Sequence, residues 1–288
     1  MSQFLLFSSL AFGALAHPLA ELLLRTTSAA SGAIPEATAW NPPSGMETAL
    51  DQVWKQTVKE NAGWSDNKDW ILDQLMANNG SINYCVRWNT DYTSTEANRT
   101  KTASALQRSL EKWVDVLVDF DGFPLTSTEV NVVGYAVKDI SLLEGDTSDI
   151  DIYTSTDADG VPECNTACYR GAHLNDADYL DTCPGGADSR YDISLWLDDS
   201  LEGQMGGFGG NWGQELGPDY LLETVEDENV HILLHEMGHG FGLLDFYDWV
   251  PEGQTNFIMM AGSAMQVTEF DAWMLRDWWR KLKAVRNW

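Results

Sequence analysis

Two histidines and an aspartate at fixed spacing place the strongest restriction on the fold of this 288-residue chain. The segment reads His235-Glu236-Met237-Gly238-His239-Gly240-Phe241-Gly242-Leu243-Leu244-Asp245. On an α-helix, His235 and His239 lie one turn apart on the same face, so both imidazoles can reach one metal ion. Gly242 can adopt the positive φ of a sharp chain reversal after the helix. Such a reversal would bring Asp245 back to the metal as a third ligand.

Glu236 follows the first histidine directly and can hold a water beside the metal instead of binding the ion itself. The full pattern of histidines, glycine and aspartate is expected by chance on the order of 0.00004 times in a chain of this composition. Two imidazole ligands favour zinc over calcium or magnesium. The segment therefore predicts a helix that carries one zinc ion.

These residues resemble the metzincin zinc peptidases, whose extended motif is HExxHxxGxx followed by His or Asp. The Asp form is similar to the snapalysin-type variant. The resemblance implies that His235, His239 and Asp245 bind one catalytic Zn²⁺ and that Glu236 is the general base of a metalloendopeptidase. It also implies an α+β fold, with a twisted mixed sheet, a central active-site helix and a C-terminal helix.

Metzincins also place a methionine on a tight turn below the metal. The segment Ile258-Met259-Met260-Ala261 fits this turn, with Met259 as the best match and Met260 as the alternative. Ala261 stands where some metzincins have a tyrosine that stabilises an oxyanion. Tyr247 could take that role, although an aromatic residue beside a zinc site more often forms a wall.

Three further residues could be taken for ligands. Asp248 is a second carboxylate near the site, as a competing ligand or a partner of the ligands, but the spacing favours Asp245. His231 lies one turn before His235, and three histidines on one helical stripe cannot bind the same ion. We therefore expect His231 to line the cleft or the surface. His173 has no partner at ligand spacing and is expected on the surface.

The charge of the chain excludes several classes of partner. There are 17 Lys and Arg residues against 44 Asp and Glu, for a net charge of −27. Binding to phosphates needs a basic face, so we expect neither nucleic acid nor a membrane surface as a partner. The hydrophobic fraction of 44% can supply a large core and argues against disorder. The expected chain is a monomer whose partner is a protein or peptide substrate, with basic peptides favoured.

The N-terminus predicts secretion. Residues 1–16 resemble a signal peptide, because 4–16 are apolar or small and end in a small-x-small cleavage site. Residues 17–39 are expected to form a loose leader or a short propeptide, and residues 40–288 a single metallopeptidase-like catalytic domain. No later apolar run reaches the roughly 18 residues that a membrane span needs. The protein is therefore predicted to be extracellular.

The four cysteines, Cys85, Cys164, Cys168 and Cys183, fit that compartment, because secreted chains pair their cysteines. Three pairings are open, of which Cys168–Cys183 with Cys85–Cys164 is favoured. A four-cysteine zinc site is the alternative, but Cys85 has no close partner in the sequence. Two sequons predict a glycoprotein if the host glycosylates: Asn79-Gly80-Ser81 and Asn98-Arg99-Thr100.

Periodicity predicts the remaining elements. Helices are expected from Ser44 onward and over 69–77, 95–117 and 226–241, and a last helix starts after Thr268 as its N-cap. Strands are expected over 82–88, 130–137, 150–153 and 191–197. The segment 203–217 holds seven glycines and is predicted to be a mobile loop.

Other readings of the sequence stay open. The segment Ser155–Gly160 resembles the start of a calcium loop, but Thr166 occupies the twelfth position, where an EF-hand needs Glu. Structural Ca²⁺ through other ligands is an alternative to a solvated acidic turn. The chain could also be a secreted zinc-containing module that binds cell-wall polymers, or a zinc hydrolase of carbohydrate amide or acetyl groups. Glu236 argues against the binding module, since a structural zinc site needs no base.

Overall fold

A six-stranded sheet forms the centre of the computed structural model, which describes residues 33–288 apart from 177 and 205. All neighbouring strands are parallel except the edge strand β7, which runs antiparallel to β8. The protein is therefore α+β with a mixed sheet, as predicted. In spatial order the strands are β5 (Asp151–Tyr153), β3 (Glu129–Val137), β1 (Ser81–Asn89), β6 (Ile193–Asp198), β8 (Gly213–Leu216) and β7 (Gly207–Gly210). A second sheet pairs β2 (Ser94–Thr95) with β4 (Leu143–Glu144).

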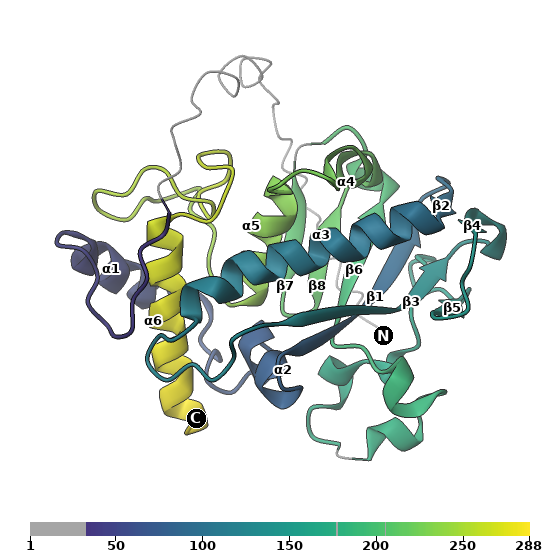
Figure 1. The fold of residues 1–288 in the computed structure, drawn as a ribbon, viewed down its shortest axis with the longest axis horizontal. Coiled ribbons are helices and arrows are strands. Elements are labelled where there is room, and N and C mark those ends of the chain that lie inside the picture. The colour runs from purple at the N-terminus through teal and green to yellow at the C-terminus, as the bar shows by residue number, and fades with distance from the viewer. Residues whose placement is uncertain (1–32, 177, 205) are drawn as a thin grey trace, which may run out of the picture. The chain divides into compact units, whose positions relative to one another are not determined.

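The helices lie around this sheet. Helix α3 packs against α5, the helix that carries the histidine motif. Helix α3 crosses the sheet and passes close to α5 (Figure 1). The indole of Trp113 on α3 donates a hydrogen bond of 2.9 Å to the Leu234 carbonyl on α5, which fixes the two helices to each other. The helices are α1 (Met46–Glu60), α2 (Ile71–Ala77), α3 (Glu96–Val114), α4 (Pro218–Thr224), α5 (His231–Gly240) and α6 (Glu269–Arg286).

The predicted signal peptide and residues 17–32 of the predicted leader lie outside the described residues. Ile34–Trp288 form one compact unit. Within the predicted leader, Ile34 packs against the core and the Pro35 carbonyl accepts a hydrogen bond from Arg276 at 3.0 Å. Among the described residues, no helix is long and apolar enough to cross a membrane.

The glycine-rich segment 203–217 is not a loop throughout, and this prediction was wrong. It forms the hairpin of β7 and β8 at the sheet edge. Strand β7 lies against α5, so that a Cβ added to Gly209 would come within 2.7 Å of the Glu236 carbonyl carbon. Glycine is required there for close approach of two backbones, and the tertiary contact overrides the weak strand propensity of glycine.

The predicted helix over 226–241 also begins too early. Helix α4 ends at Thr224 and α5 starts only at His231. The connecting segment is held by α3, because Glu226 and Glu228 pair with Lys101 and Lys112 at 2.7 and 2.5 Å. The polar residues of this segment therefore form a surface loop between α4 and α5, and not the first turns of α5.

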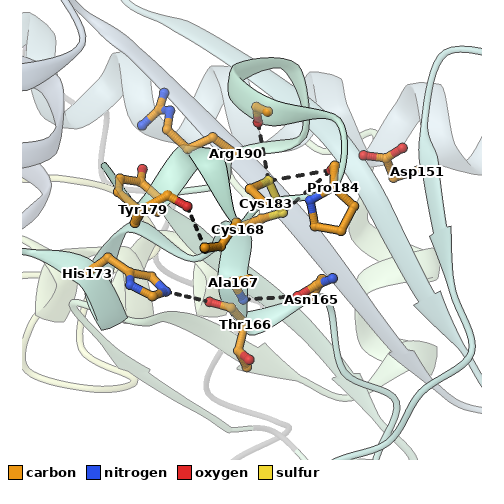
Figure 2. The surroundings of a disulfide bond; sticks show 12 residues. Asp151, Asn165, Thr166, Ala167, Cys168, His173, Tyr179, Cys183, Pro184 and Arg190 are labelled. Carbon is orange, nitrogen blue, oxygen red and sulfur yellow. Dashed lines mark hydrogen bonds between the residues drawn. A yellow bond between two sulfur atoms is a disulfide. The ribbon is translucent and has the colours of Figure 1, made fainter. Parts of the chain in front are cut away.

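Both disulfides have the favoured pairing. Cys85–Cys164 joins β1 to the segment after β5, and Cys168–Cys183 closes a local loop (Figure 2). Within this loop, His173 stacks on Tyr179 with a centroid distance of 4.9 Å and faces the Thr166 carbonyl (Figure 2). Two disulfides fit an extracellular protein.

Candidate metal centre

Helix α5 is apolar on most of its circumference, which places it in the interior. Ile232, Leu233, Leu234 and Met237 are buried, and the helix packs against β7, β8 and α3. A helix without a wide polar face has to be enclosed by other elements. His235 and His239, the two histidines of the predicted metal motif, are therefore held on a rigid, buried support.

The chain reverses directly after this helix. Gly242 has φ of 102°, its N–H donates to the His239 carbonyl, and the Leu243 N–H donates to the Gly238 carbonyl. These two bonds form a Schellman motif, in which glycine accepts the left-handed conformation without a Cβ clash. The reversal returns the chain toward the helix, as the spacing predicted, and places Asp245 opposite the histidines.

His235, His239 and Asp245 offer ligand atoms that all lie within 4.8 Å of one another. The Asp245 Oδ1 lies 3.1 Å from His235 Nε2 and 3.4 Å from His239 Nε2. This oxygen is buried and makes no hydrogen bond of acceptable geometry. Two imidazole nitrogens and one buried, unsatisfied carboxylate oxygen that converge in this way can bind a metal ion.

The remaining ring nitrogens are oriented by backbone carbonyls. His235 Nδ1 lies 2.8 Å from the Ile258 carbonyl, and His239 Nδ1 lies 2.8 Å from the Leu243 carbonyl. A carbonyl accepts only, so each Nδ1 carries the proton and each Nε2 is left as the ligand. The two carbonyls therefore select the tautomer that metal binding requires.

His235 and Asp245 shift each other's pKa values toward the charged forms. Burial lowers the pKa of His235, but its contacts with Asp245 and the Ile258 carbonyl outweigh burial, and the net pKa is raised. Burial favours neutral Asp245, yet the close approach of the His235 and His239 rings holds the pKa of Asp245 well below its usual range. Asp245 is therefore an anion in the metal-free protein and is ready to receive a cation.

Glu236 lies beside the ligands without joining them. Its Oε2 is 3.9 Å from His239 Nε2, and its side chain is buried. Burial raises the pKa of Glu236, and the two histidines offset part of this effect. Glu236 is therefore a buried carboxylate that accepts a proton more readily than an exposed one does.

A tight turn lies under the helix. The Met260 N–H donates to the Phe257 carbonyl, which places Met259 inside the turn. Met259 is fully buried, and a Cβ added to Gly238 would come within 3.0 Å of its methyl carbon. The geometry selects Met259, and not the less buried Met260, as the residue below the metal ligands.

A buried carboxylate ties this turn to the last helix. Asp271 accepts hydrogen bonds from the N–H groups of Ile258, Met259 and Thr268 at 2.9, 3.2 and 2.8 Å. With Thr268 it forms the capping box of α6, which confirms the predicted helix start. Ile258 also orients His235, so Asp271 supports the metal centre through one intermediate residue. The sequence marked Asp271 only as a capping residue.

A cavity of about 770 Å³ opens beside the metal ligands. Its walls include Glu236, His239 and Asp245, together with the whole of β7 and the turn that follows it. Phe208 on β7 and Tyr247 after the third ligand are both exposed aromatics on this cavity, at 58% and 69% exposure. Glu236, His239 and Asp245 therefore border a cavity that also has two exposed aromatic side chains on its wall.

Tyr247 and Asp248 follow the third ligand. Burial, and then the carboxylates of Asp245 and Glu236, raise the pKa of Tyr247 to about 12. Its hydroxyl thus stays protonated over the physiological range and can donate a hydrogen bond into the cleft. Asp248 is exposed and lies outside the group that could bind a metal ion, in which Asp245 is the carboxylate.

His231 does not line this cavity. It begins α5 and is mostly enclosed, and neither ring nitrogen has a hydrogen-bond partner within the described part of the chain. Burial, together with the nearby His235, lowers the pKa of His231 from 6.5 to about 4. The folded protein therefore disfavours the charged form of this histidine.

This burial predicts a loss of stability in acid. As the pH falls from 6.5 to about 4, the unfolded chain binds a proton on His231 that the folded chain excludes. We expect His231→Gln to reduce the loss of unfolding free energy between about pH 7 and about pH 4.5 by about 2 kcal/mol. Urea unfolding in the presence of a chelator measures this difference. His173→Gln is the matched control, and equal acid sensitivity in both variants would contradict the prediction.

The acidic turn at 155–160 contacts an arginine side chain and its own backbone. Asp157 forms an ion pair of 2.5 Å with Arg87 and accepts hydrogen bonds from the N–H groups of Asp159 and Val161. Within the described residues, no group outside His235, His239 and Asp245 brings three such ligands together. Asp157 therefore stabilises its turn and neutralises Arg87.

Comparison of the chain with protein-family models, with curated proteins and with solved structures gives no match. The function of this site has to be inferred from its own geometry.

Proposed function

We propose that this protein is a secreted zinc-dependent metalloendopeptidase of the metzincin type. The observation that carries the proposal is the convergence of His235, His239 and Asp245 within 4.8 Å, with the buried Glu236 carboxylate beside them. The Met259 turn below the ligands supports the same assignment. Secretion is supported by the two disulfides and by the predicted signal peptide.

The donor set supports zinc in preference to the harder cations. Two imidazoles and one carboxylate are common zinc ligands, whereas calcium and magnesium select oxygen. When bound, zinc would supply a Lewis acid that polarises a carbonyl group and acidifies water. Asp245 would reduce the charge of the site, and the carbonyls of Ile258 and Leu243 would hold the histidines in place.

Glu236 is the residue of this chain that moves the proton. Its position next to the ligands, but outside the metal group, suits a general base that takes a proton from the attacking water. The same carboxylate can then deliver the proton to the leaving amine. Burial raises the pKa of Glu236, which favours uptake of that proton.

The edge strand supports a peptide as substrate. Strand β7 lines the cleft and has a strand partner on one side only, β8, within the described sheet. Its free edge can pair with an extended peptide through backbone hydrogen bonds. This arrangement would present a peptide bond to Glu236 and the metal ligands, whereas a carbohydrate has no backbone to pair with a strand.

The test separates the proposed function from the alternatives. Casein, a basic protein and an acetylated polysaccharide are each incubated with the purified protein, with and without chelator. We expect cleavage of the two proteins, loss of this cleavage with chelator and recovery on addition of zinc. The basic protein should be favoured at low salt because of the net charge of −27, and added salt should reduce its advantage. Release of acetate alone would exclude peptidase activity.

A further inference from the structure

A second cavity shares part of its wall with the metal-site cleft. It has a volume of about 350 Å³ and lies between strands β1, β6 and β8 and the segment that carries Cys164. Trp212 and Glu215 line both cavities. A side chain of a molecule bound along β7 can therefore reach this second cavity, which we call the aromatic pocket.

Aromatic rings form the walls of the aromatic pocket. Trp196 and Trp212 lie with their ring centroids 5.5 Å apart, and Tyr169 stacks on Tyr191 at 5.3 Å. The Cys85–Cys164 disulfide holds the segment behind them against β1. The pocket thus offers flat apolar surfaces and π-faces, which suit an aliphatic stem and attract a cation.

Two carboxylates face the same space. Glu163 and Glu215 both line the pocket, and neither side chain makes a hydrogen bond or an ion pair within the part of the chain that the structure describes. Burial, and then the neighbouring Asp198, raise the pKa of Glu215, and the charge of Arg87 offsets part of this effect. A half-buried carboxylate without a partner would gain from a cation that enters the pocket.

Arg87 already shows how a cation is held there. Its guanidinium lies 3.4 Å above the centre of the Trp196 ring. Its hydrogen bonds go to Asp157 at 2.5 Å and to the Pro162 carbonyl at 2.6 Å. Asp157 is therefore the direct ion-pair partner of Arg87. With Glu163 and Glu215, three carboxylates lie around this one guanidinium, so the pocket keeps an excess of negative charge that a second cation can reduce.

We propose that the aromatic pocket binds a lysine or arginine side chain of the peptide substrate and so determines cleavage specificity. The aliphatic stem would lie against Trp212, and the charged end would reach Glu215 and Glu163. This inference rests on the proposed peptidase function. The pocket would favour a basic residue at one position of the substrate only. The overall negative charge of the protein would instead favour basic residues at every position.

Peptide pairs that differ only in lysine or norleucine, placed in turn at each position around the scissile bond, test the pocket. We expect kcat/KM to favour lysine about tenfold at one position, which corresponds to about 1.4 kcal/mol. The double variant Glu163→Gln/Glu215→Gln should bring this ratio close to one. The control double variant Glu129→Gln/Glu144→Gln removes the same charge from exposed residues that do not line the pocket, and it should keep the wild-type ratio.

A binding measurement keeps this inference separate from the proposed function. Calorimetry with the zinc-loaded Glu236→Ala protein compares a lysine-containing tetrapeptide with its norleucine counterpart. Tighter lysine binding that disappears in the pocket double variant supports the pocket even if no peptide is cleaved. Cleavage without a lysine preference at any single position overturns the pocket and leaves the peptidase assignment intact. An equal lysine preference in both double variants also overturns it.

Discussion

Replacement of Glu236 by alanine is expected to lower kcat/KM about a thousandfold while the protein keeps one zinc ion, because the general base is lost and the ligands are not. The three ligand atoms of His235, His239 and Asp245 remain within reach of one ion without Glu236. Metal analysis by atomic absorption and a peptide-cleavage assay on the same sample measure both quantities.

The control for this experiment is Glu228→Ala. Glu228 lies shortly before the same helix and pairs with Lys112 on the surface, so its loss should leave the cleavage rate unchanged. Full activity in Glu236→Ala would exclude Glu236 as the base. Loss of zinc from that variant would instead make Glu236 a ligand and would require a different base.

The second large effect is expected at Gly242, where alanine should lower the unfolding free energy by about 3 to 4 kcal/mol, since strain and overpacking add. An added Cβ would lie 2.6 Å from Cε2 and 2.9 Å from Cη2 of Trp278. That ring cannot move aside easily, because Trp54, Trp64 and Trp70 pack against it with centroid distances of 5.7, 5.7 and 5.3 Å. Urea unfolding of the metal-free protein measures the loss.

Gly253→Ala separates the two contributions. Gly253 also has a positive φ, of 73°, but an added Cβ would have no neighbour within 4 Å. Its replacement should cost only about 1 kcal/mol, from the backbone alone. We also expect Gly242→Ala, and not Gly253→Ala, to bind zinc more weakly, because Gly242 directs the chain to Asp245. Equal stability of the two variants would show that the Trp278 contact does not restrict the reversal.

Features that depend on residues close in sequence could be predicted well. The i, i+4 spacing of His235 and His239 places both on one helical face whatever surrounds the helix. The capping box of Thr268 and Asp271 and the local disulfide Cys168–Cys183 also depend on short segments. For the same reason, the reversal at Gly242 could be inferred from the sequence.

The errors concern segments whose conformation depends on distant contacts. The glycines of β7 indicate a loop when taken alone, and they form a strand because α5 approaches too closely for any side chain. The helix predicted over 226–241 begins only at His231, because two lysines of α3 hold the preceding segment on the surface by ion pairs. In both cases a neighbour far along the chain decides the outcome.

The sequence by itself determined the spacing of His235, Glu236, His239 and Asp245, because this spacing is a property of one helix and the turn that follows it. Only the tertiary structure decided that the Ile258 carbonyl selects the tautomer of His235, and that Asp271 holds the Met259 turn. It also decided that Trp212 and Glu215 join the cleft to the aromatic pocket. The physical reason is that helical periodicity is encoded within a few residues, whereas packing joins residues that the sequence separates by tens of positions.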